Sequence, residues 1–236
     1  MLKVHINTAG YDRKDGYLEN VHFEVLPGEI VGLIGANGAG KSTTIKSIIG
    51  VMKYMNGSID LPDQAELGYI PEEPILYEFL TLWEHLALAA ASFHLQQDKW
   101  ESKVEELLDI FKLTSKKDAF PIHFSKGMKQ KTLIVLSFMI QADVYIIDEP
   151  FIGLDPVATK NLIRLIKKEK ARGAAILMST HVLDTAEKIC DRFILLDEGH
   201  ILAEGNLTAI QKKASVPKTT SLLDCFYTLL EGEDIG

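Results

Sequence analysis

The chain has 236 residues, of which 47% are apolar and 25% charged, and its formal net charge is −8. These values are typical of a folded globular protein, and they argue against a disordered chain. The acidic balance argues against general affinity for nucleic acids or anionic lipids. Two isolated cysteines, Cys190 and Cys225, argue against a disulfide framework or a cysteine zinc site. We expect a cytoplasmic protein, since no secretory leader is visible and no run reaches the roughly 18 apolar residues of a membrane span.

Short runs that are apolar on both faces recur along the chain, and they predict buried parallel strands. These runs span 30–34, 67–70, 144–147, 175–178 and 193–196. Segments with helical character separate them, including 43–49, 158–171 and 182–189. The alternation of strands and helices predicts an α/β fold with a mostly parallel sheet.

A long middle segment breaks this alternation because it has helical periodicity and no convincing strand. We expect a helical subdomain at about 73–141, inserted into a core formed by about 1–72 and 142–205. A tail at about 206–236 predicts two short helices. We expect the acidic residues at its end to be solvated, namely Glu231, Glu233 and Asp234.

The segment after the run 30–34 matches the pattern GxxxxGK[ST] and is followed by a predicted helix. It consists of Gly35, Ala36, Asn37, Gly38, Ala39, Gly40, Lys41 and Ser42, followed by Thr43. Glycines let backbone N–H groups converge on phosphate oxygens, and the helix directs its positive N-terminal end at the same anion. Lys41 adds a charge at the β- and γ-phosphates, and Ser42 offers a hydroxyl to Mg²⁺. The segment therefore predicts a nucleoside triphosphate site, and the flanking strand and helix argue against a chance match.

A second motif, Asp148-Glu149-Pro150, ends the run 144–147. Carboxylates at the C-terminal end of a parallel strand face the ligand crevice of such a sheet. Asp148 is then placed to hold Mg²⁺, directly or through water, and Glu149 to polarise an attacking water. Alone, the motif also fits an ordinary turn, and its pairing with the phosphate loop favours the catalytic interpretation.

Two further residues follow predicted strands. Asp155 precedes Pro156, so it fits the N-cap of a helix as well as a functional role, and the two roles are compatible. His181 follows the run 175–178, where a γ-phosphate sensor would lie. An ordinary surface histidine at a strand end is the alternative for that position.

These motifs, together with Phe124-Ser125-Lys126-Gly127-Met128, resemble the ATP-binding cassette (ABC) family over about residues 1–205. The segment is similar to the family's LSGGQ signature, from which it departs at every position except Ser125 and Gly127. The resemblance implies a single ABC ATPase domain: a P-loop NTPase core, an N-terminal antiparallel β part and an inserted α-helical subdomain. It also implies ATP and Mg²⁺ as ligands.

The resemblance implies a role for each matching residue. Ser125 and Gly127 would complete the γ-phosphate pocket of the opposite copy in a head-to-tail homodimer, although Ser125 also fits a plain N-cap. Asp155 would cross the dimer to the partner's phosphate loop. Tyr11 stands where the family stacks an aromatic ring on adenine, and a turn tyrosine is the alternative. Glu72 stands where the family has a Gln that contacts Mg²⁺. A carboxylate also binds Mg²⁺ but adds negative charge, so this departure leaves the role of Glu72 open.

In the family, Glu149 corresponds to the catalytic base and His181 to the switch histidine. The segments 69–82 and 123–131 are similar to those of the ATPase subunits of ABC-2-type exporters. The resemblance therefore implies an ATPase on the inner face of the cell membrane, driving export through a separate integral membrane permease. The alternative is a soluble ABC ATPase, such as one serving iron–sulfur cluster assembly. A GTPase is disfavoured because no NKxD motif is present.

The chain is also expected to have a groove that binds the membrane partner. We expect residues 72–82 to form its floor and to receive a helix of the permease. The apolar residues of this segment are Ile75, Leu76, Tyr77, Phe79 and Leu80. Ordinary core packing is the alternative for them. The sequence gives no indication of the transported cargo.

Overall fold

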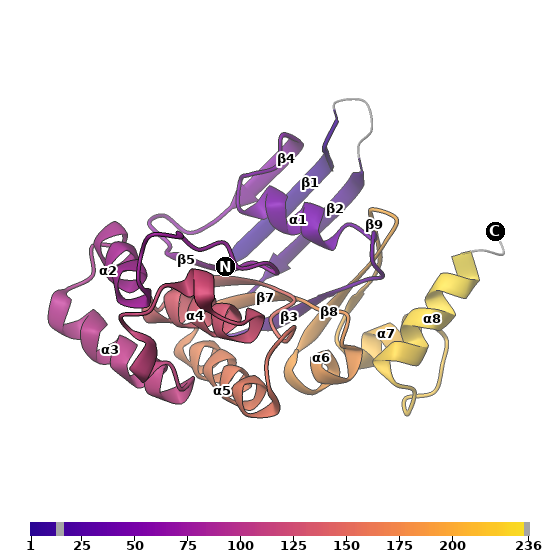
Figure 1. The fold of residues 1–236 in the computed structure, drawn as a ribbon. Coiled ribbons are helices and arrows are strands. Elements are labelled where there is room, and N and C mark those ends of the chain that lie inside the picture. The colour runs from indigo at the N-terminus through magenta and orange to yellow at the C-terminus, as the bar shows by residue number, and fades with distance from the viewer. Residues whose placement is uncertain (13–16, 234–236) are drawn as a thin grey trace.

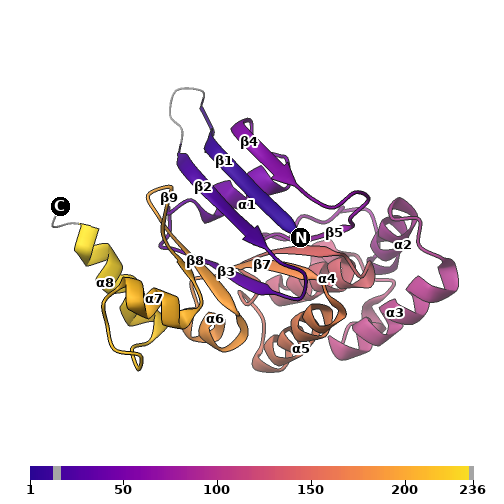
Figure 2. The ribbon, with the colours of Figure 1, turned by 180° about the vertical axis from the view of Figure 1, so that it is seen from behind.

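The computed structural model describes residues 1–12 and 17–233, and a six-stranded sheet forms its centre (Figures 1 and 2). The strand order is β5-β6-β7-β3-β8-β9. The strands are β3 (Ile30–Ile34), β5 (Leu67–Ile70), β6 (Val144–Asp148), β7 (Ala175–Ser179), β8 (Arg192–Asp197) and β9 (His200–Gly205). All neighbouring pairs are parallel except β8 and β9. The apolar runs thus form the mostly parallel sheet that the sequence predicts.

A second, three-stranded antiparallel sheet lies above the first in Figure 1 and has the order β2-β1-β4. It consists of β1 (Leu2–Gly10), β2 (Leu18–Val25) and β4 (Tyr54–Asp60). Leu2, Val4 and Ile6 alternate with exposed residues along β1, so one face of this sheet is buried. Helix α1 (Lys41–Ile48) contributes Ile45 to the same apolar cluster, which also includes residues of the central sheet.

Helices cover the other face of the central sheet, and their apolar residues join its largest cluster. These helices are α2 (Leu82–Ser92), α3 (Gln97–Ile110), α4 (Lys126–Met139) and α5 (Pro156–Arg172), with short 3₁₀ turns at Thr114–Lys116 and Pro121–His123. Figure 1 shows α2 and α3 at one end of the molecule, beyond α4 and α5. The predicted helical segment therefore packs as a layer against the α/β core.

The C-terminal part of the chain forms a third apolar cluster beside β8 and β9. It contains α6 (Leu183–Ile189), α7 (Leu207–Lys213) and α8 (Leu222–Glu233), the last two being the short helices predicted for the tail. Glu231 is exposed, whereas Asp234 lies outside the described residues. Within 1–12 and 17–233, no helix combines the length and the hydropathy needed to cross a membrane.

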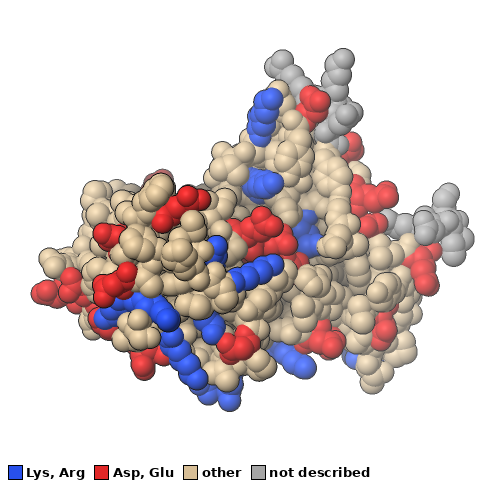
Figure 3. Space-filling view, viewed as in Figure 1, with Lys and Arg blue, Asp and Glu red and all other residues tan. Residues whose placement is uncertain are grey.

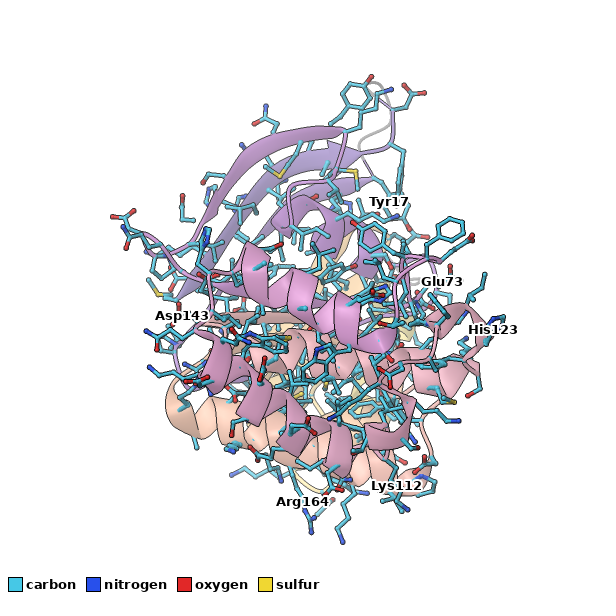
Figure 4. All side chains as sticks on the ribbon, turned by 60° about the vertical axis from the view of Figure 1, so that its left-hand side comes forward. Tyr17, Glu73, Lys112, His123, Asp143 and Arg164 are labelled. Atoms are coloured by element: carbon cyan, nitrogen blue, oxygen red, sulfur yellow. The ribbon has the colours of Figure 1, made fainter. Side chains whose placement is uncertain are left out.

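The direction of the parallel strands determines which edge of the central sheet carries the ligand crevice. The C-terminal ends of parallel strands meet at one edge of the sheet, and loops from that edge form the ligand crevice. In Figure 4, Tyr17 and Glu73 lie at this edge, and Asp143, which precedes β6, lies at the opposite one. Segments far apart in the sequence therefore meet beside Tyr17 and Glu73.

Candidate functional site

The phosphate loop connects β3 to α1 as the motif predicts. Lys41 is buried, and its Nζ donates hydrogen bonds to the carbonyl oxygens of Gly35 (2.8 Å) and Ala36 (3.0 Å). Gly40 precedes the helix with φ of 111°, a left-handed conformation that L side chains rarely adopt. A Cβ atom at this position would also lie 2.6 Å from Leu18 Cδ2. The loop is thus compact, with the ammonium group held against its own backbone.

Three carboxylates surround this ammonium group. Burial lowers the pKa of Lys41, whereas the negative charges of Glu149, Asp148 and Glu72 oppose that shift. Burial raises the pKa of Asp148, and a hydrogen bond from Ser179 opposes that shift. A divalent cation would offset the excess of negative charge among these side chains.

Asp148 and Glu149 are held by the last residue of the neighbouring strand. The Oγ of Ser179 donates a hydrogen bond to Asp148 Oδ1 (2.5 Å) and accepts one from the Glu149 backbone N–H (3.1 Å). Glu149 has φ of 45°, in the left-handed region that is unfavourable for a residue with a Cβ. Such strained positions cluster at functional sites, where the surrounding structure has to hold them.

His181 lies against the predicted catalytic base. Its Nδ1 is 2.8 Å from Glu149 Oε2, and its backbone N–H donates to the same oxygen at 3.3 Å. The Glu149 side chain is buried, whereas about half of the His181 side chain is exposed. The predicted base and the predicted switch histidine are therefore in contact within one chain.

A cavity of about 620 Å³ opens at this edge of the sheet. The predicted site residues that line it are Tyr11, Asn37, Gly38, Gly40, Lys41, Ser42, Thr43, Glu72, Asp148, Glu149 and His181. Gly35 and Ala39 form part of the loop but do not line the cavity. Three separate segments of the sequence thus converge on one pocket, together with Tyr11 and Glu72.

Tyr11 is 58% exposed at the rim of this cavity. Lys46 Nζ donates a hydrogen bond to the Tyr11 hydroxyl (3.1 Å) and lies 5.2 Å from the ring centroid. This hydrogen bond lowers the pKa of Tyr11. An exposed aromatic ring fixed in this way offers a flat face for stacking at the rim.

Three residues of the site had no role assigned from sequence. Tyr17 and Ile152 line the cavity, and Ser179 lies directly behind it. Tyr17 is an aromatic residue close to Tyr11 in sequence, which is a signal that could have identified it. Ser179 pairs in register with Asp148, and strand register is not visible in a single sequence.

The donor set at the cavity fits Mg²⁺ that arrives with a nucleotide. The described part of the chain contains no group of three or more His, Cys, Asp or Glu residues that could hold a metal ion. Mg²⁺ binds through one or two protein ligands, substrate phosphates and several waters, so it needs no such cage. The Ser42 hydroxyl and the buried Asp148 carboxylate, both facing the cavity, supply this limited set.

The variant signature begins α4, outside the cavity. Ser125 is the N-cap of the helix, and its Oγ accepts a hydrogen bond from the Met128 N–H (3.2 Å). A Cβ atom at Gly127 would lie 2.5 Å from the carbonyl oxygen of Gly153, so only glycine allows this close approach. Neither Ser125 nor Gly127 lines the cavity of its own chain.

Asp155 also lies outside the cavity and is the N-cap of α5, as the sequence predicts. Its carboxylate accepts hydrogen bonds from the Ala158 N–H (2.9 Å) and from Lys131 Nζ (2.6 Å). The bond from Lys131 holds the pKa of Asp155 at about 2. Asp155 therefore remains ionised and connects α4 to α5.

A second, more apolar cavity of about 400 Å³ lies where β5, α2 and α4 meet. Ile75, Leu76 and Tyr77 line it, as expected for the floor of a groove. Phe79 and Leu80 do not line it, which corrects the expectation for these two residues. The chain turns at 78–80 before the capping box of α2, and Phe79 is left 88% exposed.

Comparison with known proteins assigns the class. The family model "ABC transporter" matches residues 18–152, which include the phosphate loop, the signature segment and Asp148-Glu149. The chain therefore belongs to the ABC transporter family, as one of its ATP-binding proteins, and this confirms the resemblance derived from the motifs.

Particular relatives match over nearly the full chain. The ABC transporter ATP-binding protein YthP of Bacillus subtilis (strain 168) is 47% identical, over 99% of this chain and 98% of the relative. The ABC-type transporter ATP-binding protein EcsA of the same organism is 45% identical, over 100% and 98%. The exporter-type segments predict similarity to the ATPase subunit of the Ecs transporter of Gram-positive bacteria, and this is confirmed. A solved structure of an ATP-binding subunit of an ABC transporter has 44% identity and a TM-score of 0.92, covering 98% and 99% of the two chains.

Proposed function

We propose that this chain binds MgATP in the cavity at the carboxyl edge of the central sheet and hydrolyses it to power transport through a separate membrane permease. The observation that carries the proposal is the convergence of the phosphate loop, Asp148, Glu149 and His181 on one cavity. The family implies ATPase activity, and the geometry supplies a group for each requirement of that reaction.

Binding uses groups that are already in place. Tyr11 stacks on adenine at the rim, and the backbone N–H groups of the phosphate loop bind the β- and γ-phosphates. Lys41 exchanges its hydrogen bonds to loop carbonyl oxygens for bonds to phosphate oxygens. Ser42 and Asp148 would hold Mg²⁺, which would neutralise charge on the phosphates, and Glu72 lines the same cavity and would offer a further oxygen.

Hydrolysis requires that a water be aligned with the γ-phosphate. Glu149 accepts a proton from that water as general base. His181 holds Glu149 in the present structure and contacts the γ-phosphate once nucleotide is bound. The buried position of Glu149 limits competing contacts with bulk water.

The pocket of one chain lacks part of the family's site. Ser125, Gly127 and Asp155 lie outside the cavity of their own chain, although the resemblance assigns the first two to a γ-phosphate pocket and Asp155 to a phosphate loop across the dimer. We propose that a second copy supplies them in a head-to-tail homodimer with two ATP molecules between the copies. ATP binding closes this dimer, and hydrolysis with product release reopens it.

The apolar groove is the proposed contact with the permease. Ile75, which lines the 400 Å³ cavity, and Phe79, four residues further along the chain, are 87% and 88% exposed, and large exposed apolar surfaces mark interaction sites. A helix of the permease would cover them and place the chain on the inner face of the membrane. Export is the direction proposed from the ABC-2-type segments. The alternative of an iron–sulfur cluster assembly ATPase is not favoured, because the full-length relatives are transporter ATP-binding proteins.

The experiment that tests this function has two parts. Purified chain should release phosphate from MgATP, and Lys41→Ala should abolish release because the β- and γ-phosphates lose their cation. A gentle-detergent pull-down from native membranes, followed by mass spectrometry, should recover a polytopic membrane protein in stoichiometric amount. Recovery of soluble partners alone, with the chain absent from membranes, would contradict the transporter assignment.

A further inference from the structure

Ser179 ends β7 with no exposed surface, directly beside the end of β6. The two strands pair in register at this point, with Asp148 opposite Ser179. We infer that Ser179 is a positioning residue for ATP hydrolysis, whose hydroxyl fixes the metal-binding Asp148 and the base Glu149 relative to each other. The inference rests on the proposed ATPase function and concerns how the chain's own residues prepare it.

The hydroxyl group uses both of its hydrogen-bonding capacities on these two neighbours. Its proton goes to Asp148 Oδ1 at 2.5 Å, and its lone pair accepts the backbone N–H of Glu149 at 3.1 Å. A hydroxyl has one donor and two acceptor positions, so a single atom connects the carboxylate to the next peptide group. An alanine side chain can make neither bond.

The backbone at Glu149 requires such a contact. Its φ of 45° is unfavourable for a side chain with a Cβ, and surrounding bonds have to maintain it. The Glu149 N–H also lies 3.2 Å from the carbonyl oxygen of Ser179, and His181 holds the side chain of Glu149 through Oε2. The end of β7 therefore holds both the backbone and the carboxylate of the base.

The next hydroxyl in the sequence cannot replace that of Ser179. Thr180 is also fully buried, but its Oγ1 accepts a hydrogen bond from the Val182 N–H (3.0 Å) and serves the turn into α6. Because successive side chains in a strand point to opposite faces, Thr180 is not equivalent to Ser179 even where the strand ends. The link between Asp148 and Glu149 thus depends on one side chain.

The test uses three variants of the full chain. Ser179→Ala removes the hydroxyl, and Ser179→Thr retains it. Ser137→Ala is the matched control, because Ser137 is also buried and donates to a backbone oxygen, that of Tyr69 at 2.6 Å, away from the nucleotide cavity. Thermal melting of each variant shows whether it is folded under the assay conditions.

Two readouts are needed, one of which does not depend on turnover. In Ser179→Ala, kcat for MgATP should fall about ten- to hundredfold because Asp148 and the base both lose their fixed position. KM should change less, because Lys41 and the phosphate loop are intact. Hydrogen exchange of the Glu149 amide, measured without nucleotide, should accelerate roughly fivefold because it loses a partner. Ser179→Thr should recover both values, and Ser137→Ala should leave both unchanged.

Folded Ser179→Ala with the parental kcat, or with unchanged Glu149 amide exchange, would overturn the inference. If the parental chain itself releases no phosphate from MgATP, the proposed function fails instead. The exchange measurement still decides whether Ser179 holds the Glu149 backbone, so the two failures are distinguishable.

Discussion

The nucleotide cavity and the outer surface of the helical subdomain differ in how fully their side chains are buried and hydrogen-bonded within one chain. In the cavity, Lys41, Asp148 and Glu149 are buried and hydrogen-bonded within the chain. In the groove region, Ile75 and Phe79 are almost fully exposed. One chain therefore positions the phosphate loop, Asp148 and Glu149 by itself, whereas it leaves Ile75 and Phe79 without a covering partner.

The described residues that line the groove include no Asp, Glu, Lys or Arg, unlike those of the nucleotide cavity. In Figure 3, acidic and basic side chains are interspersed over this face, with basic ones gathered toward the lower left. Figure 4 places Lys112 and Arg164 together at the lower end of the molecule, away from Tyr17 at the upper end. The groove lining, by contrast, is mainly apolar, which suits a helix of a membrane protein better than a charged ligand.

The largest effect is expected inside the cavity, from Glu149→Gln. Glutamine retains the size of the side chain but cannot accept the proton of the attacking water, so kcat should fall about 10²–10⁴-fold. ATP affinity should stay near the parental value, since Lys41 and the loop are unchanged. Phosphate release and equilibrium ATP binding measure the two quantities. Glu73→Gln is the control, because exposed Glu73 does not line the cavity, and a similar loss in that variant would contradict the assignment.

The next effect concerns the groove, where Phe79→Glu and Ile75→Glu should abolish coupled transport. A charge on this exposed apolar surface opposes docking of an apolar helix, but it lies outside the nucleotide cavity. ATPase activity of the isolated chain should therefore be unchanged. Tyr227→Glu, at a 56% exposed tyrosine on α8, is the control and should transport normally. Parallel loss of transport and ATPase activity would remove the support for a separate docking surface.

A moderate effect is expected from Gly127→Ala at the start of α4. The new Cβ would lie 2.5 Å from the Gly153 carbonyl oxygen, so the loop before Asp155 has to shift. We expect a loss of about 1–3 kcal/mol in unfolding free energy, as for other overpacked sites. Urea denaturation measures it, with Gly50→Ala as a comparison. Gly50 has a positive φ, unlike Gly127, and a Cβ added there would meet no atom within 4 Å, so Gly50→Ala measures backbone strain without a clash.

The smallest effect is expected from Lys131→Met, which removes the partner of Asp155. The pair is partly exposed, so its loss should cost at most about 1 kcal/mol of unfolding free energy. The folded pKa of Asp155 is about 2, below its ordinary value of 3.8, so its contribution is complete above about pH 5 and declines as pH falls toward 2. Urea denaturation should give the same difference between parent and variant at pH 7 and pH 5. A difference that grows on acidification would contradict this ion pair.

The sequence predicts the nucleotide site better than the groove, for a physical reason. Lys41, Ser42 and Asp148 belong to short motifs whose chemistry depends on fixed spacing, and the parallel sheet brings those motifs to one edge. The role of Ser179 depends on strand register, and the exposure of Phe79 depends on a turn before α2. Neither the strand register nor this turn is encoded in a local sequence pattern. Apolar composition alone therefore predicts Phe79 on the groove floor, although Phe79 does not line the cavity.

If a second copy completes the nucleotide site, the mass of Glu149→Gln in solution should depend on MgATP. Light scattering should give the 26.3 kDa mass of one chain without nucleotide and twice that mass with saturating MgATP. Adding Ser125→Glu to this variant should prevent the increase, because a carboxylate would face the γ-phosphate of the opposite copy. A mass of one chain at saturating MgATP, with binding of ATP verified, would contradict the account.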